Sequence, residues 1–123
     1  MPRQVLKIEH SSMVPAGAVS IEGKIYLFAM NVHHWPWEGA PATVVASGAL
    51  FRSDDDGKSF RKVLQWGKRG IMTNVSPVLG PHPQTKDASV VWLFSTGRFR
   101  RSPIFLGWVE PQKIEDANPC LNI

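Results

Sequence analysis

The sequence predicts an all-β protein made of antiparallel strands, and two observations carry this prediction. Helical periodicity is almost absent over the 123 residues, which ten prolines and ten glycines interrupt often. Short runs of β-branched, aromatic and aliphatic residues recur between these turn signals, a pattern typical of short strands. Strands are expected at residues 16–21, 24–32, 49–53, 60–66, 74–79, 89–95 and 104–110.

The first four expected strands form one meander, over about residues 13–66. The triplet Glu22-Gly23-Lys24 is expected to make a tight hairpin turn, because Gly23 readily takes a positive φ. The stretch DDGKS is a second turn signal, between the third and fourth strands. The pattern then begins again with NVSPVLG, SVVWLFSTG and SPIFLGWVE, which give a second unit over about residues 73–110. Residues 111–123 are expected to form an irregular tail.

A four-stranded meander that recurs along a chain suggests the blades of a β-propeller. The runs KIYLFAM and SVVWLFS are alike in residue type and occupy the same position in the two units. We therefore favour a single partial propeller domain of about two blades. The alternative is an antiparallel sandwich of seven strands. In either fold, the aromatic residues inside the later strands are expected to lie in the core; they are Trp92, Phe94, Phe105 and Trp108.

The turn between the third and fourth strands carries a recognisable motif. Ser53, Asp55, Gly57 and Phe60, together with Ser59, fit the pattern S-x-D-x-G-x-[ST]-[WF], which resembles the Asp-box of sialidases. A carboxylate at Asp55 can accept backbone N–H groups across such a turn and hold it closed. Calcium binding and acid catalysis are the alternatives. They are less favoured, because the acids are consecutive rather than alternating and a lysine follows the glycine.

The candidate site lies at the opposite end of the expected meander, where the long connections gather. Five residues there are candidates for binding a glycan: His33, His34, Trp35, Trp37 and Arg98. Tryptophan faces stack on sugar rings, and an arginine fork donates to hydroxyl or carboxylate oxygens. The alternative is that the tryptophans pack over the end of the sheet. Neither a metal site nor a cofactor is expected, since adjacent histidines in a strand point to opposite faces.

Charge and hydropathy narrow the possible partners and locations. The net charge is +4, with basic residues at 68, 69, 98, 100 and 101. Such a cluster can bind nucleic acid, but a solvated loop is the favoured interpretation, because no nucleic-acid-binding module surrounds it. No apolar run approaches the length of a membrane span. The first residues do not form a signal peptide, so the sequence leaves the localisation open.

Several motifs, taken together, resemble the domain-of-unknown-function 4185 family of actinobacteria. They are MVPAGAVSIEGKIYLFAMNVHHW, LFRSDDDGKSF, NVSPV and VVWLFSTGRFRRSPIFLGWVEPQKIED, over roughly residues 10–116. The resemblance implies a five-bladed propeller, secreted or in the cell envelope. It also implies kinship with glycoside hydrolase family 183, whose members cut D-arabinofuranose polymers of the mycobacterial cell wall.

The chain departs from this family in length, because five blades need well over 200 residues. The family's catalytic aspartates are expected upstream of the matching segment, so no catalytic residue is carried over and the status as an enzyme stays open. Two functions are therefore expected. One is a hydrolase-like fragment that acts on arabinofuranose-containing glycans but is inactive alone. The other is a non-catalytic carbohydrate-binding or protein-interaction module. The open sheet edges of two blades also suggest self-association, or pairing with the missing blades.

Overall fold

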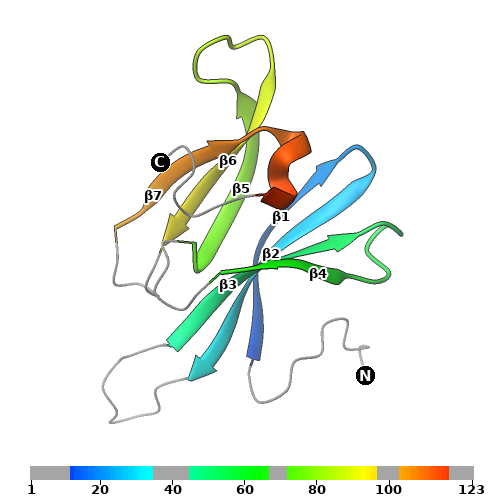
Figure 1. The fold of residues 1–123 in the computed structure, drawn as a ribbon, viewed down its shortest axis with the longest axis vertical. Coiled ribbons are helices and arrows are strands. Elements are labelled where there is room, and N and C mark those ends of the chain that lie inside the picture. Colours follow the sequence, from blue (N-terminus) through cyan, green and yellow to red (C-terminus); the bar gives the residue numbers. More distant parts are fainter. Residues whose placement is uncertain (1–11, 35–44, 67–71, 97–102, 117–123) are drawn as a thin grey trace.

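The computed structural model describes residues 12–34, 45–66, 72–96 and 103–116, and the chain is nearly all-β within them. The prediction of an all-β fold with antiparallel strands is confirmed. Two sheets are present, one of four strands and one of three (Figure 1). Their strands are β1 (Ser12–Ile21), β2 (Lys24–His34), β3 (Val45–Ser53), β4 (Arg61–Gln65), β5 (Asn74–Pro81), β6 (Ser89–Thr96) and β7 (Phe105–Val109).

The four-stranded sheet is a simple meander in the order β1-β2-β3-β4. A two-residue turn joins its first two strands, with Ile21 opposite Lys24. Both turn residues have positive φ, 51° at Glu22 and 80° at Gly23, which suits the right-handed twist of the flanking strands. The sequence located this turn correctly because a glycine stands where a side chain would cost most.

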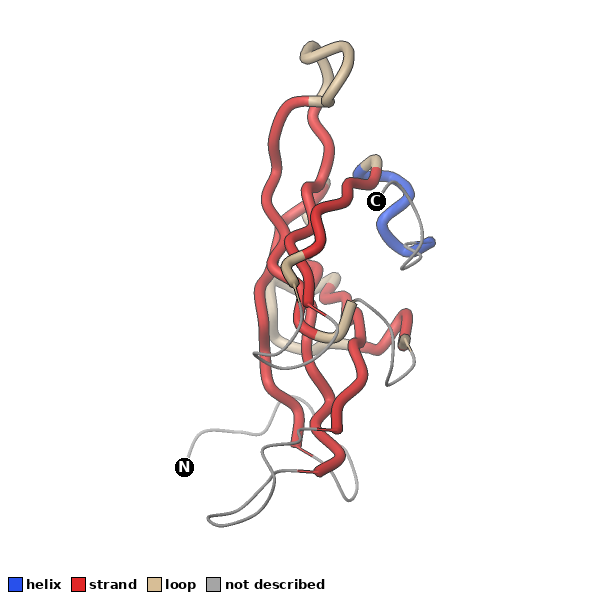
Figure 2. The backbone as a smooth tube through the Cα atoms, turned by 90° about the vertical axis from the view of Figure 1, so that its left-hand side faces the viewer, coloured by secondary structure: helices blue, strands red, loops and turns tan. Residues whose placement is uncertain are grey.

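The three-stranded sheet repeats the meander in the order β5-β6-β7. Its β5–β6 loop projects beyond the rest of the molecule, at the top of Figure 2. The loop is braced by His82, whose Nδ1 accepts the backbone N–H of Gln84 at 3.1 Å. The His82 ring also meets Trp108 edge-on, with ring centroids 4.8 Å apart. These contacts brace a loop that has no regular secondary structure.

The two sheets approach each other most closely where β1 passes β5. A Cβ atom built on Gly17 would lie 2.7 Å from Cδ of Pro77, so only glycine fits at this crossing. β2 also contacts β5, whereas the outer strands of the two sheets diverge (Figure 1). The sheets therefore form a wedge that is narrow at β1 and β5 and open towards the outer strands β4 and β7.

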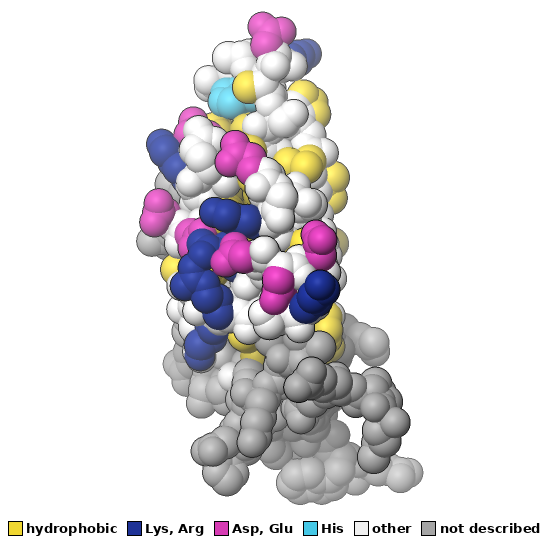
Figure 3. Space-filling view, turned by 90° about the vertical axis from the view of Figure 1, so that its right-hand side faces the viewer, with side chains coloured by type: hydrophobic (Ala, Val, Ile, Leu, Met, Phe, Trp, Pro, Cys, Tyr) yellow, Lys and Arg dark blue, Asp and Glu magenta, His cyan; other side chains and the backbone are white. Residues whose placement is uncertain are grey.

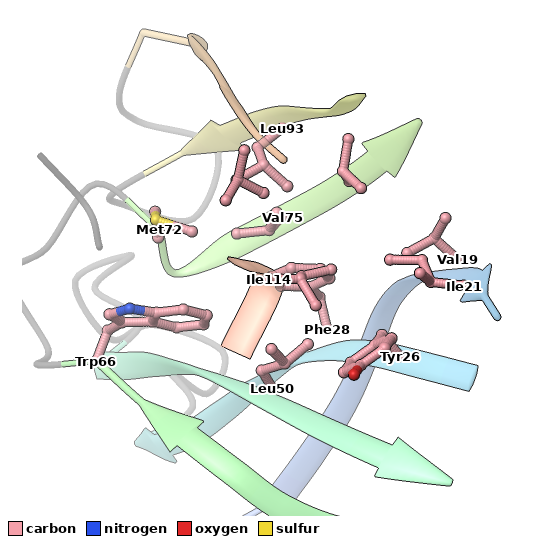
Figure 4. Packing of buried hydrophobic residues seen from close by; sticks show 12 residues of the cluster. Val19, Ile21, Tyr26, Phe28, Leu50, Trp66, Met72, Val75, Leu93 and Ile114 are labelled. Atoms are coloured by element: carbon pink, nitrogen blue, oxygen red, sulfur yellow. The ribbon is translucent and has the colours of Figure 1, made fainter. Parts of the chain in front are cut away.

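The open side of the wedge is filled by a 3-10 helix, η1 (Pro111–Asp116). Its Ile114 is fully buried and lies among side chains from both sheets, next to Phe28 (Figure 4). Phe28 in turn stacks on Trp66 with the ring planes 5° from parallel. The core so formed comprises Val19, Ile21, Tyr26, Phe28, Leu50, Trp66, Met72, Val75, Val91, Leu93, Val109 and Ile114.

This helix differs from the irregular tail expected at 111–123. Pro111 begins it, and a proline has the fixed φ that suits the first position of a helix. Its order comes from burial of Ile114 between the sheets, a contact that local sequence does not signal. Residues 117–123 of the expected tail lie outside the described residues.

The expectation that the aromatic residues of β6 and β7 are core was wrong for Phe94, which is 44% exposed. Val91 and Leu93 of β6 point into the core, so their neighbours Trp92 and Phe94 point to the opposite face of the sheet. Trp108 lies directly opposite Trp92 and shares that outward face. The sequence did not show which face of β6 is buried, because the strand carries apolar residues on both faces.

The Asp-box turn is held by side-chain hydrogen bonds within residues 53–59. Oδ1 of Asp55 accepts the backbone N–H of Ser59 at 2.9 Å, and Oδ2 accepts its hydroxyl at 2.5 Å. The buried hydroxyl of Ser53 donates to Asp55 and accepts the N–H of Gly57, both at 2.8 Å. Asp56 and Gly57 take positive φ at the apex of the turn. Phe60 then packs on Ala29, Ala49 and Phe51.

The contribution of η1 to stability can be tested with two isoleucines. Replacing Ile114 by alanine is expected to lower the free energy of unfolding by about 2–5 kcal/mol, because a fully buried side chain is removed from the core. Ile104→Ala is the matched control, since Ile104 is 71% exposed. Chemical denaturation of both variants measures the difference. Equal stability of the two would contradict the filling role of η1.

The Asp-box can be tested with two aspartates. The hydroxyl of Ser59, then its backbone N–H, then Ser53 lower the pKa of Asp55 to about 2. Asp55→Asn should lower the thermal midpoint by roughly 5 °C at neutral pH, because an amide cannot accept hydrogen bonds on both atoms. A lowered folded-state pKa gives stability that is present above about pH 4 and is lost towards pH 2. Asp56→Asn removes the same charge at an exposed position and should change the midpoint little.

Candidate functional site

The connections predicted to carry the site all leave from one end of the strands. The antiparallel order puts the end of β2, the start of β3 and the end of β4 together. In the other sheet, the start of β5 meets the end of β6, where the N–H of Thr73 donates to Thr96 at 2.9 Å. The two groups adjoin, because a Cβ on Gly48 would collide with Met72 and touch Trp66. We call this region the loop end.

The structure places two of the predicted site residues at the loop end. His33 and His34 are the last residues of β2, and His34 pairs with Val45 beyond an irregularity in the register. The other three candidates, Trp35, Trp37 and Arg98, lie outside the described residues. The same is true of Glu38 and of the basic residues at 68, 69, 100 and 101. What the structure describes is the set of strand ends that flank these residues, and those ends adjoin at the loop end.

Polar side chains that the sequence did not single out are buried near the loop end. Asn31 and Ser47 face each other across β2 and β3, and Thr73 and Ser95 lie in or beside the other sheet. Oδ1 of Asn31 is buried and has no hydrogen-bond partner in the described part of the chain. An amide oxygen can accept a hydrogen bond, but this one is shielded from solvent. The available signal was an asparagine within the apolar run FAMNV.

A second polar cluster ties η1 to the four-stranded sheet, away from the loop end. Oε2 of Glu115 accepts the hydroxyl of Tyr26 at 2.8 Å and Nη1 of Arg52 at 2.6 Å. Nε of Arg52 lies 3.1 Å from Asp54 Oδ1, close enough for an ion pair but not aligned as a hydrogen bond. Acidic and basic side chains alternate over this side of the molecule (Figure 3). The sequence did not reveal the cluster, because its members come from three separate segments.

The pKa shifts in this cluster indicate a structural rather than a catalytic role. Burial raises the pKa of Tyr26, and its hydrogen bond to Glu115 raises it further. Burial also opposes ionisation of Glu115, but the hydrogen bonds from Tyr26 and Arg52 outweigh it and hold the pKa of Glu115 below its ordinary value. The pKa of Asp55 is lowered as well. A glycosidase general acid needs the opposite shift, a raised carboxyl pKa.

Within residues 12–34, 45–66, 72–96 and 103–116, no group of three or more histidine, cysteine or acidic side chains could hold a metal ion. The same residues contain no helix long and apolar enough to cross a membrane.

Comparison with known proteins gives no family for the chain: no protein-family model matches it, and no curated protein is significantly similar to it. The candidate site therefore rests on the loop residues singled out in the sequence and on the geometry of the strand ends.

The structural role of Glu115 can be tested by its pH dependence. Glu115→Gln should lower the thermal midpoint at neutral pH, because the ion pair with Arg52 is lost. Since the folded-state pKa of Glu115 is lowered, its contribution is present above the ordinary carboxyl pKa and is lost as pH falls below it. The difference in thermal midpoint between the Glu115 variant and the unmodified chain should therefore decrease at acidic pH. Glu110→Gln, which affects only exposed contacts with Lys113 and Gln112, is the control and should differ little at any pH.

Proposed function

We propose that the chain forms two adjoining blades of a β-propeller and binds an arabinofuranose-rich glycan at its loop end without hydrolysing it. The observation that carries the proposal is that the strand ends flanking the site-bearing connections lie together at the loop end, opposite the Asp-box turn. The resemblance to the domain-of-unknown-function 4185 family suggests the class of glycan. Its motifs lie in the same order along this chain.

The wedge between the sheets supports a propeller rather than a sandwich. The first strand of each meander, β1 and β5, lies at the narrow side, and each sheet runs outwards from there. Blades arranged around an axis have this relation, because their first strands are close together and their last strands are far apart. A sandwich keeps its two sheets about equally far apart over their whole faces. Helix η1 fills the wide side of the wedge, which agrees with two blades that diverge from a common axis.

Glycan binding is supported by the residue types at the loop end. Trp35 and Trp37 can stack on furanose rings, while Arg98 and the two histidines at the end of β2 offer donors to hydroxyl groups. These interactions need no acid pair, so binding does not depend on the catalytic residues expected upstream in the family.

The absence of hydrolysis is supported by the state of the carboxylates. Both known types of glycosidase place two carboxyl groups about one bond, and one of them is a protonated acid. Among the described residues, the two carboxyl groups with shifted pKa values, on Asp55 and Glu115, are shifted the wrong way and serve structural hydrogen bonds. Of the connections at the loop end, residues 35–44, 67–73 and 97–104, only the first contains an acid, Glu38.

A non-catalytic protein-interaction module is the second candidate function. One observation favours it, the apolar face of the three-stranded sheet on which Val78, Phe94 and Leu106 are exposed. Apolar faces of this kind are uncommon on isolated proteins and mark protein contacts. The two functions use different surfaces, so one chain can have both.

Glycan binding can be tested by tryptophan fluorescence during titration with arabinan fragments. Affinity should be weak, roughly millimolar, because part of a groove buries little of the ligand. Trp35→Ala and Arg98→Ala should abolish or strongly reduce the spectral change. Arg61→Ala is the matched control for charge, since Arg61 is exposed on β4, and it should bind like the unmodified chain.

The same preparation should release no oligosaccharide from arabinogalactan. Release would overturn the non-hydrolytic part of the proposal. A titration without any spectral change, or an equal loss in the Arg61 and Arg98 variants, would overturn the assignment of binding to the loop end.

A further inference from the structure

We propose that the β5–β6 loop, residues 82–88, is a pH-sensitive cover for two tryptophans of the three-stranded sheet, closed when the imidazole of His82 is neutral and released when it is protonated. The two residues are Trp92 of β6 and Trp108 of β7, which lie directly opposite each other on the face that points away from the core. We call them the tryptophan pair. The inference rests on contacts within the described residues and is independent of glycan binding.

His82 organises the loop through both its side chain and its backbone. Its Nδ1 accepts the backbone N–H of Gln84 at 3.1 Å and that of Thr85 at 3.3 Å. Its own N–H donates to the carbonyl of Ala88 at 2.8 Å, and its carbonyl accepts the N–H of Lys86 at 3.2 Å. The loop is therefore folded around a single imidazole ring.

The two donors to Nδ1 fix the protonation state of this ring. A backbone N–H can only donate, so Nδ1 is unprotonated and the proton of the neutral imidazole lies on Nε2. Pro83 follows His82 and has a fixed φ and no N–H of its own, which suits a tight turn at this position. Among residues 81–89, His82 is the only one that is not exposed. The closed loop thus requires a neutral His82.

The closed loop contacts both members of the tryptophan pair. The ring of His82 meets Trp108 edge-on, with ring centroids 4.8 Å apart. Nε1 of Trp92 donates to the carbonyl of Pro81 at 3.0 Å, and a Cβ atom built on Gly80 would lie 2.8 Å from Cδ1 of Trp92. The indole of Trp92 therefore lies against the backbone where β5 enters the loop. A movement of the loop will change the surroundings of both tryptophans.

Protonation of His82 turns the acceptor at Nδ1 into a donor. The N–H groups of Gln84 and Thr85 would then face an N–H of a cationic ring, so both hydrogen bonds are lost and the groups repel one another. An imidazolium is attracted to the ring of Trp108, but this attraction gives the two N–H groups no other acceptor. Histidine side chains change their charge between about pH 8 and pH 5, so we expect the loop to open within that range.

The charged groups around His82 do not offset this effect. Strands β5, β6 and β7, on which the loop rests, contain no charged residue. Beyond β7, Glu110 is paired with Lys113. The loop itself carries one charge of each sign, on Lys86 and Asp87, and both residues are exposed. Asp87 is the only acid in the loop, so a substitution there separates its titration from that of His82.

The opening of the loop can be measured by amide hydrogen exchange, followed by NMR on the full chain. Protection of the Gln84 and Thr85 amides should fall by about tenfold between pH 7.5 and pH 5.5, because opening is linked to the uptake of one proton. The indole N–H signal of Trp92 should shift over the same range. The amide of Ser59 is the internal control. It is held by Asp55, whose pKa is lowered to about 2, so its protection should not change.

His82→Asn is the matched variant. An asparagine at this position can accept the same two N–H groups in an Asx turn, but it does not titrate. Its loop should therefore keep the Gln84 and Thr85 amides protected throughout the pH range. Asp87→Asn should leave the pH dependence of the unmodified chain unchanged.

Constant protection of the Gln84 and Thr85 amides in the unmodified chain would overturn the proposal. So would a pH dependence that persists in His82→Asn or disappears in Asp87→Asn. If the asparagine variant does not form the loop, the ring signals of His82 in the unmodified chain decide the question. Their titration should have the same midpoint as the change at the two amides, and a different midpoint would overturn the proposal.

Discussion

The wedge between the two sheets is the constraint on which the rest of the structure depends. Contact at Gly17 and Pro77 holds β1 against β5 so closely that the sheets must diverge beyond this crossing. The gap has to be filled, because an empty apolar space forfeits packing energy. Ile114 of η1 fills it, and Glu115 of the same helix binds Arg52 and Tyr26. The last described segment of the chain thus joins both sheets into one core.

The carboxylates that hold the fold lie away from the loop end, where the candidate site residues are. The hairpin turns carry many of the acidic side chains, and the carboxylates of Asp55 and Glu115 are already engaged in hydrogen bonds that hold the fold. A carboxylate whose oxygens are occupied in this way is poorly placed to exchange protons with a substrate. The loop end has a different character, because the connections that leave from it carry aromatic and basic residues in the sequence.

The sequence predicted what local chemistry determines. Turn residues such as Gly23 and Gly57 mark the hairpins, and alternating runs mark the strands, so the two meanders could be located in order. Two features could not be predicted. The helix η1 is too short for periodicity, and Ile114 is buried by strands distant in sequence. In β6, apolar residues occupy both faces, so period two cannot tell which face is covered. For the candidate site, the sequence located the strand ends. The side chains of Trp35, Trp37 and Arg98 belong to connections outside the described residues.

The loop end and the exposed apolar face of the three-stranded sheet point in different directions. Val78, Phe94 and Leu106 lie on a face of that sheet, whereas the loop end lies at the termini of the strands. A partner that packs on the face of a sheet leaves its strand termini accessible. The two candidate functions therefore do not compete for one surface, because covering the apolar face would leave the loop end open to a glycan.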